Sequence, residues 1–208
     1  MSRLVGVVLA GGQSRRMGED KAALSIGGET LLLRARRLLL EAGCDEVVMS
    51  GPPRAEWPHR RVEDPVAGAG PVAGIVAALR WIAAADESRA ESPASTPASL
   101  HNSRLLFVAV DTPLLQPQSL RSLSEAGPDA DACIFADSPL PLVLSNNPDV
   151  RARIDLAERQ LRAGGSCSIR WLMDGLKVER LGVTACTDQL RNINTPDEWR
   201  KLNDELAN

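Results

Sequence analysis

Aromatic side chains and an excess of charge of one sign are both lacking in this sequence. Tyrosine is absent from the 208 residues, and aromatic residues make up only 3% of them. The 24 Lys and Arg residues stand against 27 Asp and Glu residues, which gives a net charge of −3. Proteins that bind single-stranded nucleic acid stack bases on aromatic rings, and general phosphate-backbone binders are strongly basic. The composition therefore argues against a nucleic-acid-binding protein.

Cysteine and histidine are scarce and dispersed. No CxxC pair occurs. The four cysteines and two histidines are Cys44, Cys133, Cys167, Cys186, His59 and His101. This spacing argues against a zinc site and a disulfide framework, so we expect reduced, structural thiols. His59 lies in a Pro-rich, basic stretch, residues 54–61, which we expect at the surface. Neither a G-x-S-x-G elbow nor a Ser-His-Asp order is present, which argues against a serine hydrolase.

Long hydrophobic runs are missing too. The apolar stretch 4–10 ends at Gly11 and Gly12, which is too early for an export signal or a membrane span. We therefore expect a cytoplasmic protein. The length and the 44% hydrophobic content fit a single domain, residues 1–208, that buries roughly 70% of the surface of its unfolded chain.

Predicted strands alternate with predicted helices along the chain. Apolar runs bounded by turn residues predict strands at about 4–10, 45–50, 61–64, 105–110, 132–136, 140–144 and 176–181. Helical spacing behind Thr, Gly-Pro, Pro or Asn-Pro predicts helices from about 30, 71, 117, 148 and 196, with a short helical turn at 171–172. This order predicts an α/β fold, a three-layer α/β/α sandwich with a mostly parallel sheet. A hairpin at 132–144 adds one antiparallel strand.

Two surface features follow from the same pattern. Arg34, Arg36 and Arg37 are expected on the solvated face of their helix. Residues 86–103 are rich in Ser, Ala and Pro and longer than most structural loops. We expect this segment to be a flexible, dispensable insertion at the surface.

Glycines and cations gather directly after the first predicted strand. Residues 9–21 have the sequence LAGGQSRRMGEDK, in which glycine permits close approach of backbone N–H groups to a ligand and three cations follow. This combination suits a polyphosphate. No G-x-G-x-x-G and no G-K-[ST] occurs, so neither the dinucleotide-binding fingerprint nor a Walker A loop is present. A tight turn with solvated charges is the structural alternative.

Carboxylates follow two further predicted strands. Asp64 precedes a glycine-containing loop that enters a helix at Pro71, and helix N-termini favour anions. Asp111 comes directly after the strand at 105–110, where one carboxylate and substrate phosphates would suit Mg²⁺ better than zinc. An ordinary Asp-Pro turn and an Asx turn are the structural alternatives for these two residues.

The segment Asn-Ile-Asn-Thr-Pro-Asp-Glu at 192–198 divides into two parts. Thr195, Pro196 and Glu198 are typical of a capping box with proline at the first helical position. Capping does not require Asn192 or Asn194, whose amides both donate and accept hydrogen bonds. These two side chains are therefore open to a polar ligand.

Four segments in order resemble the motifs of the molybdenum cofactor guanylyltransferases. They are LAGGxSRRMGxDK (9–21), GPVAG (70–74), VDTP (110–113) and NINTP (192–196), and they span nearly the whole chain. The resemblance implies a nucleotidyltransferase of Rossmann-like fold. Such an enzyme takes GTP, Mg²⁺ and the molybdenum-loaded pterin cofactor (Mo-molybdopterin), transfers GMP to the terminal phosphate of the pterin and releases pyrophosphate. We expect a monomer in transient contact with molybdoenzymes or their chaperones.

The resemblance also implies roles for individual residues. The implied nucleotide-binding set is Leu9, Ala10, Gly11, Gly12, Lys21, Asp64, Gly70 and Asp111. Arg16 and Lys21 would face the triphosphate, and Asp111 would hold Mg²⁺, which makes these three the implied catalytic residues. Asn192 and Asn194 would border the reacting centre or the pterin.

Two departures from the family pattern and two other functions stay open. Ser50 stands where the family commonly has asparagine, and residues 137–142 lack the Gly and His often found there. Related cytidylyltransferases tend to carry alanine in place of Gly11, so Gly11 favours guanylyl transfer. The alternatives are a cytidylyltransferase or another cofactor- or sugar-nucleotide-forming enzyme, and a non-catalytic nucleotide-binding carrier or adaptor for molybdoenzymes.

Overall fold

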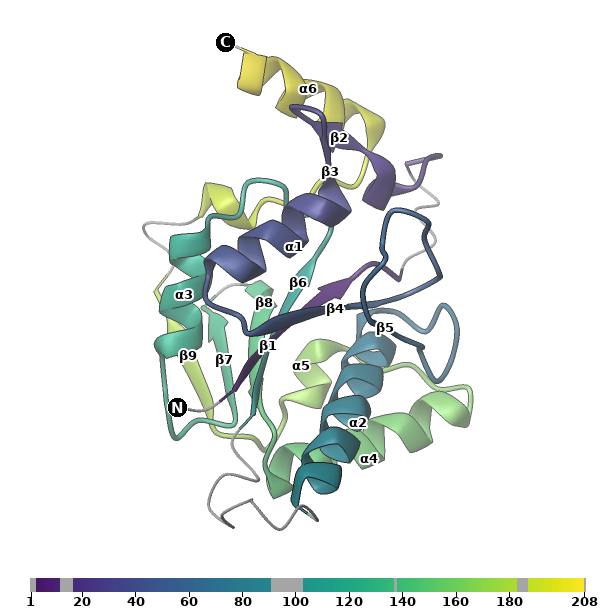
Figure 1. The fold of residues 1–208 in the computed structure, drawn as a ribbon, viewed down its shortest axis with the longest axis vertical. Helices are drawn as coiled ribbons and strands as arrows, with labels where there is room; N and C mark the ends of the chain where they lie inside the picture. Colours follow the sequence, from purple (N-terminus) through teal and green to yellow (C-terminus); the bar gives the residue numbers. More distant parts are fainter. Residues whose placement is uncertain (1–2, 12–16, 91–102, 137, 183–186, 208) are drawn as a thin grey trace.

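A seven-stranded sheet forms the centre of the molecule (Figure 1). The computed structural model describes residues 3–11, 17–90, 103–136, 138–182 and 187–207. In spatial order the strands are β5 (Arg61–Val62), β4 (Glu46–Ser50), β1 (Leu4–Leu9), β6 (Arg104–Ala109), β8 (Ser138–Ser145), β7 (Ala132–Phe135) and β9 (Val178–Leu181). Strand β8 runs antiparallel to β6 and β7, and the other neighbouring pairs are parallel. The predicted sandwich with one antiparallel strand is confirmed.

Helices cover both faces of this sheet (Figure 1). The helices that pack on it are α1 (Leu31–Glu41), α2 (Pro71–Ala90), α3 (Pro117–Glu125), α4 (Pro148–Arg162) and α5 (Ile169–Leu172). Side chains alternate along β1, so Val5 and Val7 join the core with α2 and α4, whereas Val8 joins the core with α1 and α3. Hydrophobic residues therefore fill both sides of the sheet, as its near-continuous apolar strands predict.

The predicted helix starts rest on side-chain caps. Thr30 Oγ1 accepts a hydrogen bond from Leu33 N at 3.3 Å, and Asn147 Oδ1 accepts one from Val150 N at 2.9 Å. At α6 (Pro196–Ala207), Thr195 N donates to Glu198 Oε2 at 3.0 Å and Glu198 N donates to Thr195 Oγ1 at 3.3 Å. This reciprocal pair is the predicted capping box.

A small hairpin between the first motif and α1 is absent from the sequence prediction. Its strands are β2 (Ser25–Ile26) and β3 (Glu29–Thr30), which pair antiparallel. Figure 1 shows α6 above this hairpin. Met17, Ile193 and Leu202 form a small buried cluster, against which Ile26 of β2 and Trp199 of α6 pack. Two-residue strands carry too little periodicity to be recognised in a sequence.

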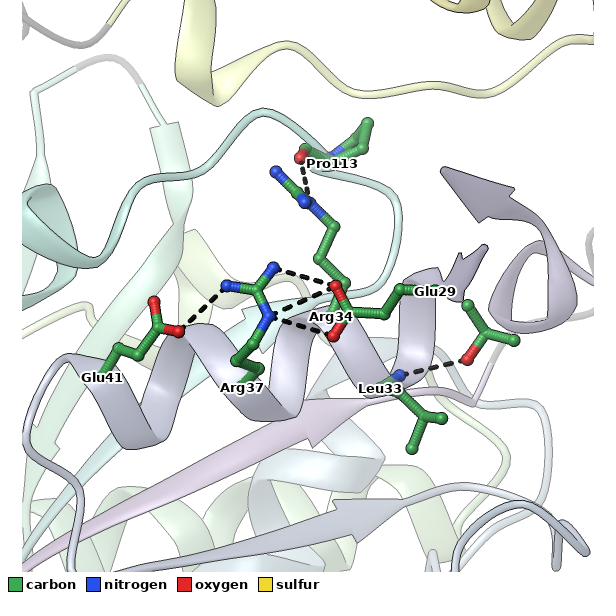
Figure 2. Close-up of polar contacts among 7 residues, drawn as sticks. Glu29, Leu33, Arg34, Arg37, Glu41 and Pro113 are labelled. Carbon is green, nitrogen blue, oxygen red and sulfur yellow. Dashed lines mark hydrogen bonds and ion pairs between the residues drawn. The ribbon is translucent and has the colours of Figure 1, made fainter. Parts of the chain in front are cut away.

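Two of the arginines on the solvated face of α1 also make specific contacts. Figure 2 shows Arg37 between Glu29 of β3 and Glu41, with its Nη2 2.9 Å from Glu29 Oε2 and its Nη1 3.0 Å from Glu41 Oε1. Arg34 Nε donates to the carbonyl of Pro113 at 2.8 Å. The helix is thereby tied to the hairpin and to the loop that follows β6.

The ends of the expected insertion belong to the folded body, which corrects the limits 86–103. Helix α2 continues to residue 90, and Asp86 and Ser103 are buried. Asp86 accepts hydrogen bonds from Ser103 Oγ at 3.3 Å and from Asn146 Nδ2 at 2.8 Å. Burial of a carboxylate requires such partners, so these residues are structural, and residues 91–102 lie outside the described part of the chain.

Two further expectations concern thiols and membranes. Cys44, Cys133 and Cys167 are free thiols, as predicted, and Cys186 lies outside the described residues. Burial raises the pKa of Cys44 to about 12, which keeps this thiol protonated and inert. Within the described ranges, no helix combines the length and apolar character that crossing a membrane requires.

Candidate active site

The carboxyl ends of neighbouring parallel strands bring distant residues to one edge of the sheet. Leu9, the last residue of β1, pairs with Ser50 at the end of β4 and with Ala109 at the end of β6. The segments that follow these strands therefore leave the sheet side by side. Ligands of open α/β sheets bind at this edge.

Lys21, Asp111 and Asn194 meet at that edge. Lys21 Nζ lies 3.2 Å from Asp111 Oδ2 and 2.7 Å from Asn194 Oδ1. The side chains of Lys21 and Asp111 are 14% and 22% exposed, so both are reachable by a ligand while largely shielded from solvent. The backbone supports this arrangement, because Ile193 N donates to the carbonyl of Asp111 at 2.8 Å.

Lys21 and Asp111 line a cavity that we call the central hollow. It has a volume of about 320 Å³. The predicted site residues on its walls are Leu9, Ala10, Gly11, Lys21, Asp111 and Asn192. Pro71, the first residue of the 20-residue helix α2, lies on the same wall, so the positive end of a helix dipole faces the hollow.

A second cavity, the outer hollow, adjoins the first at Gly11. It has a volume of about 700 Å³ and contains the other predicted residues, Asp64 and Gly70. A side chain on Gly11 would place its Cβ 2.9 Å from Asp64 Oδ2, so a larger residue would displace the Asp64 carboxylate where the two hollows meet. Of the predicted residues that the structure describes, all except Asn194 lie on the walls of these two cavities, which share Gly11.

Ser50 supports Asp64, a role that the sequence analysis left unassigned. Ser50 is 1% exposed and its Oγ donates to Asp64 Oδ1 at 2.5 Å. Burial raises the pKa of Asp64 above its usual value, although the hydrogen bond from Ser50 and the charge of Arg61 oppose the shift. The contact joins the ends of β4 and β5, which no spacing in the sequence reveals.

A third cavity, the distal hollow, adjoins the central hollow at Pro139. It has a volume of about 660 Å³ and is lined by two arginines, Arg170 and Arg180, together with Asp174. These arginines lie on α5 and β9, outside every sequence motif, so no role was predicted for them. Their positive charge would suit a phosphorylated ligand.

Two predicted residues cannot be placed. Gly12 and Arg16 lie outside the described residues.

Gly70 adopts a φ of +82°, a left-handed conformation that favours glycine directly before α2.

The donor set around Asp111 fits a magnesium ion. No group of three or more His, Cys, Asp or Glu side chains that could hold a metal occurs among the described residues. Mg²⁺ is commonly bound through one or two carboxylates, with substrate phosphates and water as the remaining ligands. A single partly exposed carboxylate on the wall of the central hollow meets this requirement.

Comparison with known proteins identifies the family of the chain. The sequence matches the MobA-like NTP transferase domain over residues 6–170. It is 34% identical over 199 residues to a molybdenum cofactor guanylyltransferase of Xanthomonas euvesicatoria pv. vesicatoria, with 95% of this chain and 93% of that protein covered.

Solved structures share the fold. Molybdopterin-guanine dinucleotide biosynthesis protein A from Archaeoglobus fulgidus superposes with a TM-score of 0.71 at 20% identity, with 98% of each chain covered. Rv0371c from Mycobacterium tuberculosis H37Rv, solved in complex with manganese, gives a TM-score of 0.59 at 20% identity over 98% of this chain and 99% of that one. The domain match over most of the sequence and the 34% identity to the Xanthomonas enzyme show that the chain belongs to the MobA-like NTP transferase family.

Proposed function

We propose that this protein transfers GMP from GTP to the terminal phosphate of Mo-molybdopterin, giving the guanine dinucleotide cofactor and pyrophosphate. The observation that carries the proposal is the meeting of Lys21 and Asp111 on the wall of the central hollow, where Lys21 also donates a hydrogen bond to Asn194. The name of the Xanthomonas relative supplies the nucleotide and the acceptor.

The three connected hollows suggest how the substrates are arranged. The guanosine part of GTP occupies the outer hollow beside Asp64 and Gly70, and its triphosphate lies in the central hollow. The pterin enters from the opposite side through the distal hollow, where Arg170 and Arg180 attract its phosphate. The acceptor phosphate and the α-phosphorus of GTP then meet in the central hollow, which Asn192 borders.

Transfer of a nucleotidyl group needs positioning and charge neutralisation rather than a protein nucleophile. A terminal phosphate oxygen of the acceptor forms a bond with the α-phosphorus while the bond to the bridging oxygen of pyrophosphate breaks. Lys21 stabilises the negative charge that passes to the leaving pyrophosphate, and we assign Arg16 the same task. Asp111 would hold Mg²⁺, which neutralises phosphate charge when bound.

An acceptor-dependent assay tests the proposal. Purified protein is incubated with GTP, Mg²⁺ and Mo-molybdopterin, and released pyrophosphate and the dinucleotide product are measured. Release that requires both the acceptor and the metal is expected. Tight GTP binding without turnover in the presence of acceptor would instead indicate a nucleotide-binding carrier.

A second measurement addresses the choice of base. Thermal unfolding is followed with GTP, CTP and UTP side by side, because a ligand that binds the native state raises the midpoint of unfolding. GTP is expected to act at the lowest concentration. A larger rise of the unfolding midpoint with CTP than with GTP would indicate a cytidylyltransferase.

A further inference from the structure

Arg54 joins the two ends of the first motif, residues 9–21. It lies in the loop between β4 and β5, and its side chain is only 9% exposed. Its Nη2 donates to Asp20 Oδ1 at 3.0 Å and to the carbonyl of Ala10 at 3.3 Å, and its Nη1 pairs with Asp20 Oδ2. One guanidinium therefore connects the end of β1 with the residue before Lys21.

The loop that carries Arg54 is a packed support, although its basic, Pro-rich sequence suggests an ordinary surface stretch. Trp57 is 5% exposed, and its backbone N–H donates to the carbonyl of Arg54 at 3.2 Å. Its indole Nε1 donates to the carbonyl of Arg60 at 2.9 Å. The buried tryptophan thereby fixes the turn that presents Arg54.

Asp20 transmits this support to Lys21. It caps the 3₁₀ helix Lys21–Ala23, because its Oδ1 accepts a hydrogen bond from Ala22 N at 3.1 Å. A three-residue helix has too few internal hydrogen bonds to be stable by itself. The backbone of Lys21 thus depends on Asp20, and the Asp20 carboxylate depends on Arg54. The hydrogen bond from Arg54 also lowers the pKa of Asp20, which keeps this carboxylate charged.

The geometry points to Arg54 as a positioning residue for nucleotidyl transfer, an inference that rests on the proposed function. It acts through Asp20 on Lys21 and through the carbonyl of Ala10 on the backbone that lines the central hollow. Its planar fork reaches all these acceptors at once, which the single ammonium of a lysine does not.

Steady-state kinetics of four variants test this role. Arg54→Gln removes the guanidinium group, and Arg54→Lys keeps only its charge. Asp20→Asn replaces the partner carboxylate, on a side chain that is 45% exposed, by a neutral amide. Arg60→Gln is the matched control, because this exposed arginine of the same loop contacts Trp81 rather than the site. For Arg54→Gln we expect kcat/KM for GTP to fall about 10- to 100-fold, as a small displacement of a positioned group does. The KM for the acceptor is expected to stay unchanged.

The remaining variants separate positioning from general stability. Arg54→Lys is expected to restore part of kcat/KM, and Asp20→Asn to add little in the Arg54→Gln background, because residues that act as one unit are not additive. Unchanged kcat/KM in Arg54→Gln, or effects of the two substitutions that multiply, would overturn the inference. If Arg54→Gln fails to fold, the exposed Asp20→Asn carries the test, and wild-type kcat/KM in it would be equally decisive.

GTP binding measured by calorimetry distinguishes failure of this inference from failure of the proposed function. A wild-type protein that binds GTP without transferring it would refute the proposed function. Even then, wild-type GTP affinity in Arg54→Gln would refute the role of Arg54, and weakened affinity in that variant but not in Arg60→Gln would support it.

Discussion

Lys21 Nζ and Asp111 Oδ2 lie 3.2 Å apart although 90 positions separate them in the sequence. The pair holds a cation and a carboxylate together at the wall of the central hollow, with the Asn194 amide oxygen as a second acceptor for the lysine. A triphosphate that enters this hollow competes with Asp111 for the ammonium group. The site is therefore charged and ordered before its substrates arrive.

Removal of either charge of this pair is expected to abolish transfer without unfolding the protein. For Lys21→Met and Asp111→Asn we expect kcat/KM to fall at least about 100-fold, the usual cost of losing one group that stabilises the transition state. The midpoint of thermal unfolding should change by a few degrees at most. Arg80→Gln, which removes the ion pairs of α2 with Asp155 and Glu158 of α4, is the control. Wild-type rates in either site variant would contradict the assigned roles.

Gly11 provides a steric prediction. In Gly11→Ala the new Cβ would lie 2.9 Å from Asp64 Oδ2 and 3.5 Å from Gly51 Cα, so it intrudes between the outer and central hollows. We expect GTP affinity to fall at least about tenfold while the fold is kept, as overpacking displaces the carboxylate. Gly182→Ala is the control, because among the described residues no atom beyond its chain neighbours lies within 4 Å of the added Cβ. Equal GTP affinities in calorimetry for the two variants would refute the close approach.

Local sequence patterns predicted the strands, the helix caps and the position of candidate site residues directly after strands, because each of these depends on neighbours in the sequence. Thr30, Asn147 and the Thr195–Glu198 box are examples. The order of motifs was sufficient to name Lys21 and Asp111. The partners of these residues were not predictable in the same way.

Contacts between loops that follow different strands could not be predicted from the sequence. Arg54 with Asp20, and Ser50 with Asp64, are pairs whose members approach only after the sheet has formed. Neither pair has a fixed spacing, and arginine and serine are ordinary surface residues in isolation. The small hairpin β2–β3 was missed for a different reason, since its short strands show no period.

The raised pKa of Asp64 predicts how stability changes with pH. Its value exceeds the 3.8 of the unfolded chain because burial disfavours the charged form. The folded state then binds more protons than the unfolded state in this range, so the contribution of Asp64 to stability is full below pH 3.8 and is lost as pH rises through the folded pKa.

Asp64→Asn removes that titration. Across mildly acidic to neutral pH, the free energy of unfolding from urea denaturation should fall less steeply with rising pH in this variant than in the wild type. The same substitution is expected to weaken GTP binding, because Asp64 faces the outer hollow. Glu63→Gln, at the neighbouring carboxylate, is the control for a general charge effect. Parallel pH profiles of wild type and Asp64→Asn would show that burial of Asp64 carries no such cost.

Substitution of the buried Asp86 is expected to lower the free energy of unfolding and leave the catalytic rate unchanged. In Asp86→Ala the amide of Asn146, which is 1% exposed, loses its 2.8 Å partner, and Ser103 loses its acceptor. An unpaired buried polar group costs about 1–3 kcal/mol, and we expect the free energy of unfolding to fall by this amount in denaturant titration. Glu87→Ala is the matched control, because this adjacent carboxylate is exposed and loses only a 3.5 Å contact with Arg151. For this control we expect the free energy of unfolding to fall by less than about 1 kcal/mol.

Ser103 precedes β6, at the end of the sheet opposite the site, so kcat/KM should be the same in both variants and in the wild type. Equal stability of the two variants would mean that Asp86 does not anchor the end of α2, whereas a selective loss of activity in Asp86→Ala would mean that the two ends of the sheet are coupled.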